Sequence, residues 1–163
     1  MTLPAYPSDI RVSDMADRLL EKFVLHNDIK ETTRLGELLA AFTEKYDVPP
    51  HLAFRIDLIL DELVTNIIKY GYKDQQKNHK QEIFVEIFSC APDILKIVII
   101  DSSSEFNPLK ARTPDVSSSI EERPIGGLGI HFAKQFTKEM FYQRKSNQNH
   151  LTMIIDFNEK LTQ

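Results

Sequence analysis

The spacing of the apolar residues changes near the middle of this 163-residue chain, and this change constrains the fold more than any other feature. Residues 50–70 carry apolar side chains at intervals of three and four, which predicts a long amphipathic helix. Pro49 and Pro50 suit its first turn, and Gly71 is expected to end it. Residues 29–46 show the same spacing and predict a helix before it.

The second half of the chain has the pattern of strands. Residues 82–89 and 94–100 are rich in Ile, Val and Phe and are joined by a turn signal, which predicts a hairpin; residues 140–144 and 151–157 predict another. A short apolar run at residues 22–26 predicts an edge strand. Helices first and antiparallel hairpins later, with one more helix between the hairpins, predict an α+β two-layer sandwich.

The composition is that of one ordinary globular domain. Hydrophobic residues make up 42% and charged residues 27% of the chain, and the net charge of −4 gives no electrostatic reason to expect nucleic acid. Cys90 is the only cysteine, which excludes an internal disulfide and favours a reducing compartment. There is no signal-peptide pattern and no apolar run of the roughly 20 residues that a membrane span needs. We expect a cytoplasmic domain at residues 22–163 after an N-terminal extension at residues 1–21.

The stretch between Asp101 and Gly126 shows no periodicity. It contains three prolines and two runs of three serines, and it is long for a loop in a compact domain. An interdomain linker is one reading, but the segments on either side are too short to build separate cores. We therefore interpret it as a mobile lid.

Glu62 and Asn66 are the first candidate site residues. Four positions separate them by roughly 40° around the predicted helix, so both lie at the edge of its apolar stripe. A carboxylate can accept a proton from a hydroxyl group, and an amide oxygen can bind Mg²⁺. Taken alone, such a pair on a helix edge is usually just solvated.

Asp101 and a glycine cluster are the other candidates. Asp101 ends an apolar strand, where it can accept a hydrogen bond from an amino group or initiate a turn through its own backbone. Gly126, Gly127 and Gly129 precede a helical pattern. Glycines at a helix start let backbone amides approach phosphates, although a helix start without a ligand can have the same sequence.

In this order the three segments resemble the motifs of the Bergerat-fold (GHKL, histidine-kinase-like) ATPases, and in particular the small anti-sigma-factor serine/threonine kinases. Residues 62–72, Glu-Leu-Val-Thr-Asn-Ile-Ile-Lys-Tyr-Gly-Tyr, resemble the N box. Residues 101–108, Asp-Ser-Ser-Ser-Glu-Phe-Asn-Pro, resemble the first glycine box, and residues 124–130, Pro-Ile-Gly-Gly-Leu-Gly-Ile, the second. The likeness covers roughly residues 22–157.

The resemblance implies a mixed, mainly antiparallel sheet covered on one face by helices, with ATP and Mg²⁺ as cofactors. It implies that Glu62 is the general base, that Asn66 holds Mg²⁺, and that Asp101 accepts from the adenine amino group. Gly127 and Gly129 would let the lid close over the triphosphate. The other nucleotide-binding residues that the two glycine boxes imply are Ser103, Gly126 and Leu128.

Two residues depart from the family pattern. The family has a glycine at the position of Ser103, and serine would weaken binding by about 1 kcal/mol or more if that position required positive φ or close approach of the backbone to adenine. Some relatives have an arginine where Ile125 stands, and Arg123 is a nearby substitute.

The implied function is an ATP-dependent serine/threonine protein kinase that phosphorylates a STAS-domain antagonist and sequesters a sigma factor. The added phosphate would repel the antagonist from its docking surface and switch partners. The alternative is a non-catalytic nucleotide-binding or docking module, which Ser103 and Ile125 favour. A sensor histidine kinase fragment is disfavoured because no separate phospho-acceptor domain fits this length. We expect no direct nucleic-acid or membrane contact, and the family suggests a homodimer.

Overall fold

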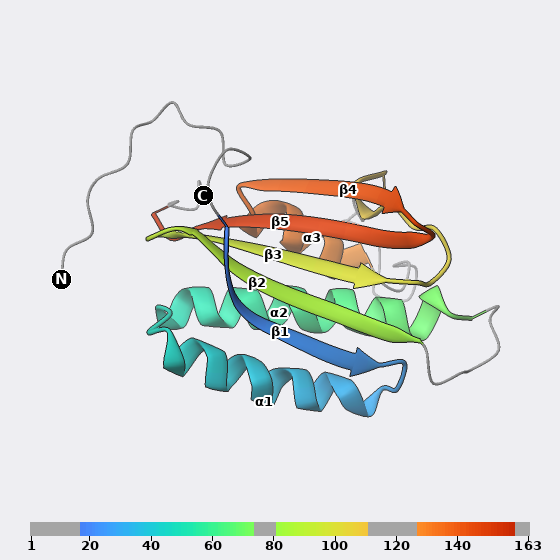
Figure 1. Cartoon of the computed structure of the whole chain (residues 1–163), viewed down its shortest axis with the longest axis horizontal. Helices are drawn as coiled ribbons and strands as arrows, with labels where there is room; N and C mark the ends of the chain where they lie inside the picture. Colours follow the sequence, from blue (N-terminus) through green and yellow to red (C-terminus); the bar gives the residue numbers. More distant parts are fainter. Residues whose placement is uncertain (1–16, 74–80, 111–126, 159–163) are drawn as a thin grey trace, which may run out of the picture.

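The computed structural model of the chain describes residues 17–73, 81–110 and 127–158, which form a two-layer sandwich (Figure 1). In chain order the elements are β1 (Arg18–His26), α1 (Lys30–Lys45), α2 (Pro50–Asn66), the π-helical turn η2 (Ile67–Gly71), β2 (Glu82–Ala91), β3 (Ile94–Asp101), the 3-10 turn η3 (Pro108–Lys110), α3 (Gly127–Phe136), β4 (Glu139–Lys145) and β5 (Gln148–Asp156).

One layer is a five-stranded sheet with the order β1-β2-β3-β5-β4. All four pairings are antiparallel. The hairpin of β4 and β5 joins the sheet through β5, which pairs with β3 and places Asn149 directly opposite Asp101. The helices form the other layer, on one face of the sheet (Figure 1).

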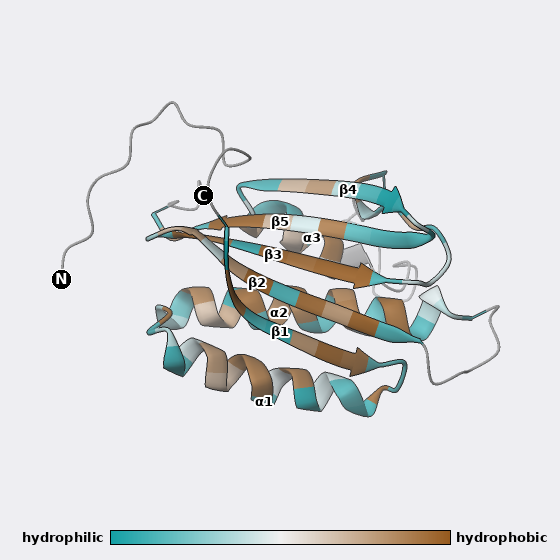
Figure 2. Ribbon diagram, viewed as in Figure 1, coloured by the Kyte–Doolittle hydropathy of each residue, from teal (hydrophilic) through white to brown (hydrophobic). Residues whose placement is uncertain are grey.

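The core lies between the two layers. Along β2 and β3 buried residues alternate with partly exposed ones, so each strand presents one apolar face to the helices. Hydrophobic and hydrophilic residues alternate along α1 and α2 (Figure 2), and the buried residues of both helices are hydrophobic. Burying a large aliphatic side chain contributes about 1.5–3 kcal/mol. The fully buried ones include Leu52, Ile56, Ile59, Leu60, Ile83, Ile87, Ile97 and Ile99.

The α+β sandwich predicted from the sequence is confirmed, with the refinement that every pairing among the described strands is antiparallel. The edge strand begins at Arg18, so residues 18–21 belong to the sheet and not to the predicted extension. A register shift between Leu19 and Glu21 breaks the alternation there, which hid this part of the strand from a periodicity argument. Residues 1–16 lie outside the described residues.

The helix predicted over residues 50–70 is α2 followed by η2, where the backbone widens into a π-helical turn. Such turns are rare in proteins as a whole, but those that occur are often found at functional sites. The Ser104 amide donates to the Gly71 carbonyl at 3.0 Å, which joins the end of η2 to the loop after β3. Within the described ranges, no helix has the length and apolar character needed to cross a membrane.

Candidate functional site

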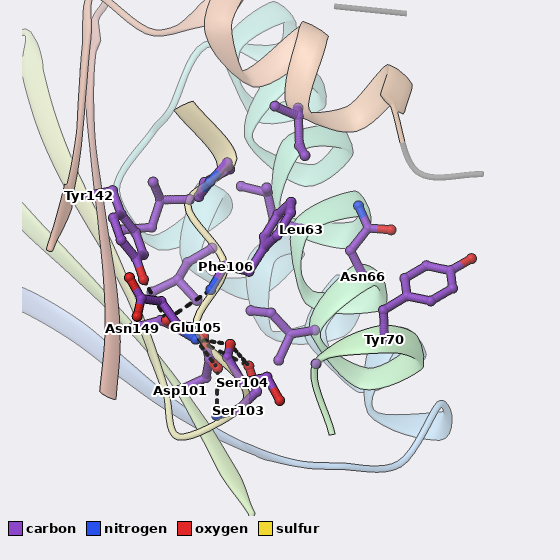
Figure 3. A pocket seen from close by; sticks show the side chains of 16 residues that line it. Leu63, Asn66, Tyr70, Asp101, Ser103, Ser104, Glu105, Phe106, Tyr142 and Asn149 are labelled. Carbon is purple, nitrogen blue, oxygen red and sulfur yellow. Dashed lines mark hydrogen bonds between the residues drawn. The ribbon is translucent and has the colours of Figure 1, made fainter. Parts of the chain in front are cut away.

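A cavity of about 370 Å³ lies between the end of α2 and the end of β3 (Figure 3). This volume is within the range of pockets that bind small molecules and cofactors. One wall comes from α2 and η2, and the other comes from the sheet and the loop after β3. The lining residues are Leu63, Asn66, Ile67, Tyr70, Gly71, Ile99, Asp101, Ser103, Ser104, Glu105, Phe106, Pro108, Ile130, Tyr142, Asn149 and Leu151.

Asn66 is the polar residue that α2 contributes to the cavity. Its Nδ2 atom is buried and has no hydrogen-bond partner among the described residues. Leaving a buried polar group unpaired costs about 1–3 kcal/mol, so a ligand that satisfies this amide would be favoured. Rotation of the amide group presents either its oxygen or its nitrogen to such a ligand. The Asn66 amide could therefore bind a metal ion through its oxygen or donate a hydrogen bond to a ligand through its nitrogen.

Asp101 is the acceptor on the sheet wall. Only 3% of this residue is exposed. Its Oδ1 atom accepts from the Ser103 amide at 2.9 Å and from Asn149 Nδ2 at 3.0 Å. No described residue donates to Oδ2, and Asp101 lines the cavity. The second oxygen is therefore an acceptor for a donor group in the cavity.

Asn149 is a central site residue that the sequence did not indicate. It is 5% exposed, and its Nδ2 atom donates to Asp101 Oδ1, to Ser103 Oγ at 3.2 Å and to the Ser104 carbonyl at 3.1 Å. Its Oδ1 atom accepts from the Tyr142 hydroxyl and from Arg144 Nη1, both at 2.8 Å. From the sequence Asn149 belonged to the predicted hairpin turn, whereas in the structure it is the second residue of β5.

Ser103 fits the site without backbone strain. It is not among the non-glycine residues with positive φ, which are Asp47, Ser146 and Asn147. The room for its side chain comes from Gly71, because a Cβ atom at Gly71 would lie 2.7 Å from both Cβ and Oγ of Ser103. Positive φ, the first condition under which serine was expected to weaken the site, is therefore absent.

Glu62 lies beside the cavity and does not line it. It contacts the first turn of α3, where a Cβ atom at Gly129 would lie 2.3 Å from Glu62 Cβ and 2.9 Å from its Oε2. A carboxylate near the amino end of a helix is stabilised by the helix dipole. The structure thus brings Asn66, Asp101 and Ser103 together and places Glu62 against α3.

The glycine cluster is partly described. Gly127 and Leu128 form the start of α3, and Gly129 is buried in its first turn. Gly126, Arg123, Ile125 and most of the predicted lid, residues 111–126, lie outside the described residues.

Two tyrosines lie close to the loop after β3. The Tyr72 hydroxyl accepts from the Ser102 amide at 3.3 Å and donates to the Glu82 carbonyl at 3.4 Å. Burial raises the pKa of Tyr72, and burial followed by the nearby Glu105 carboxylate raises the pKa of Tyr142. Both hydroxyl groups therefore stay protonated at neutral pH and can act as donors.

Comparison with known proteins shows what this chain is similar to. The family model for the histidine kinase-like ATPase domain matches residues 25–155, a range that includes every residue lining the cavity. The serine/threonine-protein kinase BtrW of Bordetella bronchiseptica is 26% identical over 102 residues, which cover 63% of this chain and 69% of that protein.

Proposed function

This chain belongs to the histidine kinase-like ATPase family, and from that membership we propose that it binds ATP in the cavity between α2 and β3 and acts as a serine/threonine protein kinase. One observation carries the proposal. The cavity gathers the Asn66 amide and the Asp101 carboxylate from elements far apart in the sequence. Among the described residues, Asn66 Nδ2 has no hydrogen-bond partner and Asp101 Oδ2 receives no hydrogen bond.

The two walls suit the two ends of the nucleotide. The free oxygen of Asp101 would accept from the amino group of adenine, which is a hydrogen-bond donor. The amide oxygen of Asn66 would bind Mg²⁺ at the phosphates. The metal ion, when bound, neutralises phosphate charge.

Glu62 is the proposed general base. It precedes Asn66 by about one turn on the same edge of α2. In the proposed complex its carboxylate would lie next to the phosphates. In the proposed reaction Glu62 accepts the proton of a serine or threonine hydroxyl on a protein substrate as that oxygen attacks the γ-phosphate. The similarity to BtrW, a serine/threonine-protein kinase, supports this type of acceptor.

The proposed protein substrate is a STAS-domain antagonist, and the proposed regulated partner is a sigma factor. These two assignments come from the resemblance to the anti-sigma-factor kinases. Phosphorylation would add about −1.5 to −2 charges to the antagonist, which would weaken its docking and leave the kinase to bind the sigma factor.

The test is phosphate transfer from radiolabelled ATP to a STAS-domain protein encoded beside this gene. We expect Glu62→Gln to retain ATP binding and to lose transfer by about a hundredfold or more. Asp61→Asn makes the same change at the adjacent, exposed position of α2 and should transfer at the parent rate. Equal rates for Glu62→Gln and the parent would remove Glu62 as the base.

A binding module without catalysis is the second candidate. It is favoured by the position of Glu62, which does not line the cavity and packs against Gly129. ATP binding by the parent without transfer to any STAS-domain partner would support this candidate over the kinase.

A further inference from the structure

The side-chain amide of Asn149 is held in one orientation (Figure 3). Its oxygen accepts from Tyr142 and from Arg144, and its nitrogen donates toward Asp101 and two neighbouring acceptors. Turning the amide over would place its N–H groups against the Arg144 guanidinium and its oxygen against the Asp101 carboxylate. Both contacts would be repulsive, so the surrounding donors and acceptors determine which way the amide points.

The fixed amide in turn fixes the Asp101 carboxylate. Asn149 Nδ2 and the Ser103 amide both donate to Oδ1, at 3.0 and 2.9 Å. Both donors are directed at Oδ1, so the protein itself supplies the hydrogen bonds of that oxygen. Oδ2 receives no hydrogen bond from any described residue, so this oxygen is presented to the cavity as an acceptor.

We propose that Asn149 is a positioning residue that makes the site selective for a 6-aminopurine over a 6-oxopurine. The inference rests on the proposed ATP site and adds to it a residue that acts through Asp101. Adenine presents an amino donor at its 6 position, whereas guanine presents a carbonyl acceptor there. Hypoxanthine, the base of ITP, likewise has an oxo group. A 6-oxopurine would therefore place two acceptors opposite each other, an arrangement that sites built on buried hydrogen bonds reject strongly.

The deciding variant is Asn149→Asp, which keeps the side-chain shape and replaces the donor with a second carboxylate. Two carboxylates at hydrogen-bond distance share a proton, because both cannot ionise freely. The new carboxylate would face Arg144 and Tyr142, so the proton of the pair would lie on Asp101 Oδ2, the oxygen that faces the cavity. From Oδ2 it could be donated to a 6-oxo group. Binding of Mg·ATP and Mg·ITP is measured by calorimetry at about pH 6 and about pH 8 in the parent and the variant.

The parent should bind ATP at least about tenfold more tightly than ITP at both pH values. In Asn149→Asp, ATP affinity should fall about tenfold, the two nucleotides should bind within about threefold of each other, and ITP binding should tighten as the pH falls. If Asn149 had only a structural role, the variant would bind both nucleotides more weakly by the same factor, and ITP affinity would not depend on pH in this way.

Asn147→Asp is the matched control. It makes the same substitution in the same hairpin, at a turn residue outside the cavity whose φ of 62° aspartate tolerates. Its Oδ1 accepts from Arg144 Nη2 at 3.0 Å, and a carboxylate keeps that bond. This control should keep the parent ratio of ATP to ITP affinity.

Arg144→Met is the second variant, used if Asn149→Asp shows no cooperative melting transition. Arg144 donates to Asn149 but does not line the cavity. Its loss would free the Asn149 amide to turn, so the ratio of ATP to ITP affinity should fall at least about threefold. If Asn149→Asp keeps the parent ratio of ATP to ITP affinity, this inference is overturned and the proposed ATP site still stands. Where Asn149→Asp is unfolded, the same ratio in Arg144→Met decides. A parent that binds neither nucleotide overturns both.

Discussion

At the scale of single residues, Gly129 is constrained by one side chain of the neighbouring helix. A Cβ atom there would lie 2.3 Å from Glu62 Cβ, an atom fixed to the backbone of α2 that cannot rotate away. Any larger residue at position 129 must therefore push α3 away from α2. This contact couples the proposed base to the start of α3.

Gly129→Ala should lower the free energy of unfolding by about 1–3 kcal/mol, as over-packing usually does. Gly36→Ala is the matched control within α1, where the new methyl group would meet only Asp57 Oδ1 at an ordinary contact distance of 3.9 Å. It should be neutral or stabilise by up to about 1 kcal/mol through helix propensity. Urea denaturation of both variants measures the difference, and equal midpoints would contradict the close packing of Gly129 on Glu62.

Cys90 is expected to be an unreactive thiol. Burial and then the hydrogen bond to Asp17 raise its pKa to about 12. Since the thiolate is the reactive form, alkylation by iodoacetamide near pH 8 should be about a hundredfold or more slower in the native protein than in urea. The folded state holds the neutral thiol, so stability should also fall as the pH rises above the ordinary value of 9.0. Comparable native and unfolded alkylation rates would show that the thiol is accessible and ionised.

The residues of the site differ in how far local sequence signals could identify them. Asn66 at the edge of an apolar stripe and Asp101 at the end of an apolar strand were both predicted, and the structure places them on facing walls of one cavity. Asn149 was missed because its partner Asp101 is 48 positions away and meets it only through the register of β3 and β5. No local pattern encodes that register.

At the scale of elements, the site depends on how η2 meets the loop after β3. Gly71, the last residue of η2, packs against Ser103, and its carbonyl accepts from the Ser104 amide. The serine that replaces the family's glycine is thus accommodated by a glycine on the opposite element.

Gly71→Ala should lower the free energy of unfolding by about 1–3 kcal/mol, because its methyl group would overlap Ser103. Ser103→Gly alone should also destabilise, because it removes the hydroxyl that accepts from Asn149. In the double variant the overlap is gone. The double variant should therefore lose less stability than the sum of the losses measured for the two single variants. Strictly additive urea midpoints for the two singles and the double would contradict the packing of Gly71 on Ser103.

The helices and hairpins themselves were predictable, because each is set by a local period of apolar residues. The strand order was not, since the insertion of β5 between β3 and β4 depends on contacts between distant segments. The start of β1 was also missed, because the irregular register near Leu19 hides its alternation.

At the scale of the whole molecule, the sandwich holds two distant parts of the chain at a fixed separation. The helical layer supplies Asn66 and the sheet supplies Asp101, so the proposed ligand would contact both layers. A ligand that binds only this folded arrangement must stabilise it against unfolding. Nucleotide binding and global stability should therefore change together.

The most direct measurement is the titration of Mg·ATP into the parent, Asp101→Asn and the control Asp93→Asn, with binding heat and melting temperature recorded in parallel. Asp93 lies in the turn at the opposite end of β3, where it accepts from Asn158. The parent and the control should gain about 2.7 kcal/mol of stability at a hundredfold excess of ATP over the dissociation constant. Asp101→Asn should bind at least about tenfold more weakly, because the acceptor for the adenine amino group is lost. Equal ATP affinity in Asp101→Asn and the parent, or no binding by the parent at millimolar ATP, would contradict the assignment of this cavity.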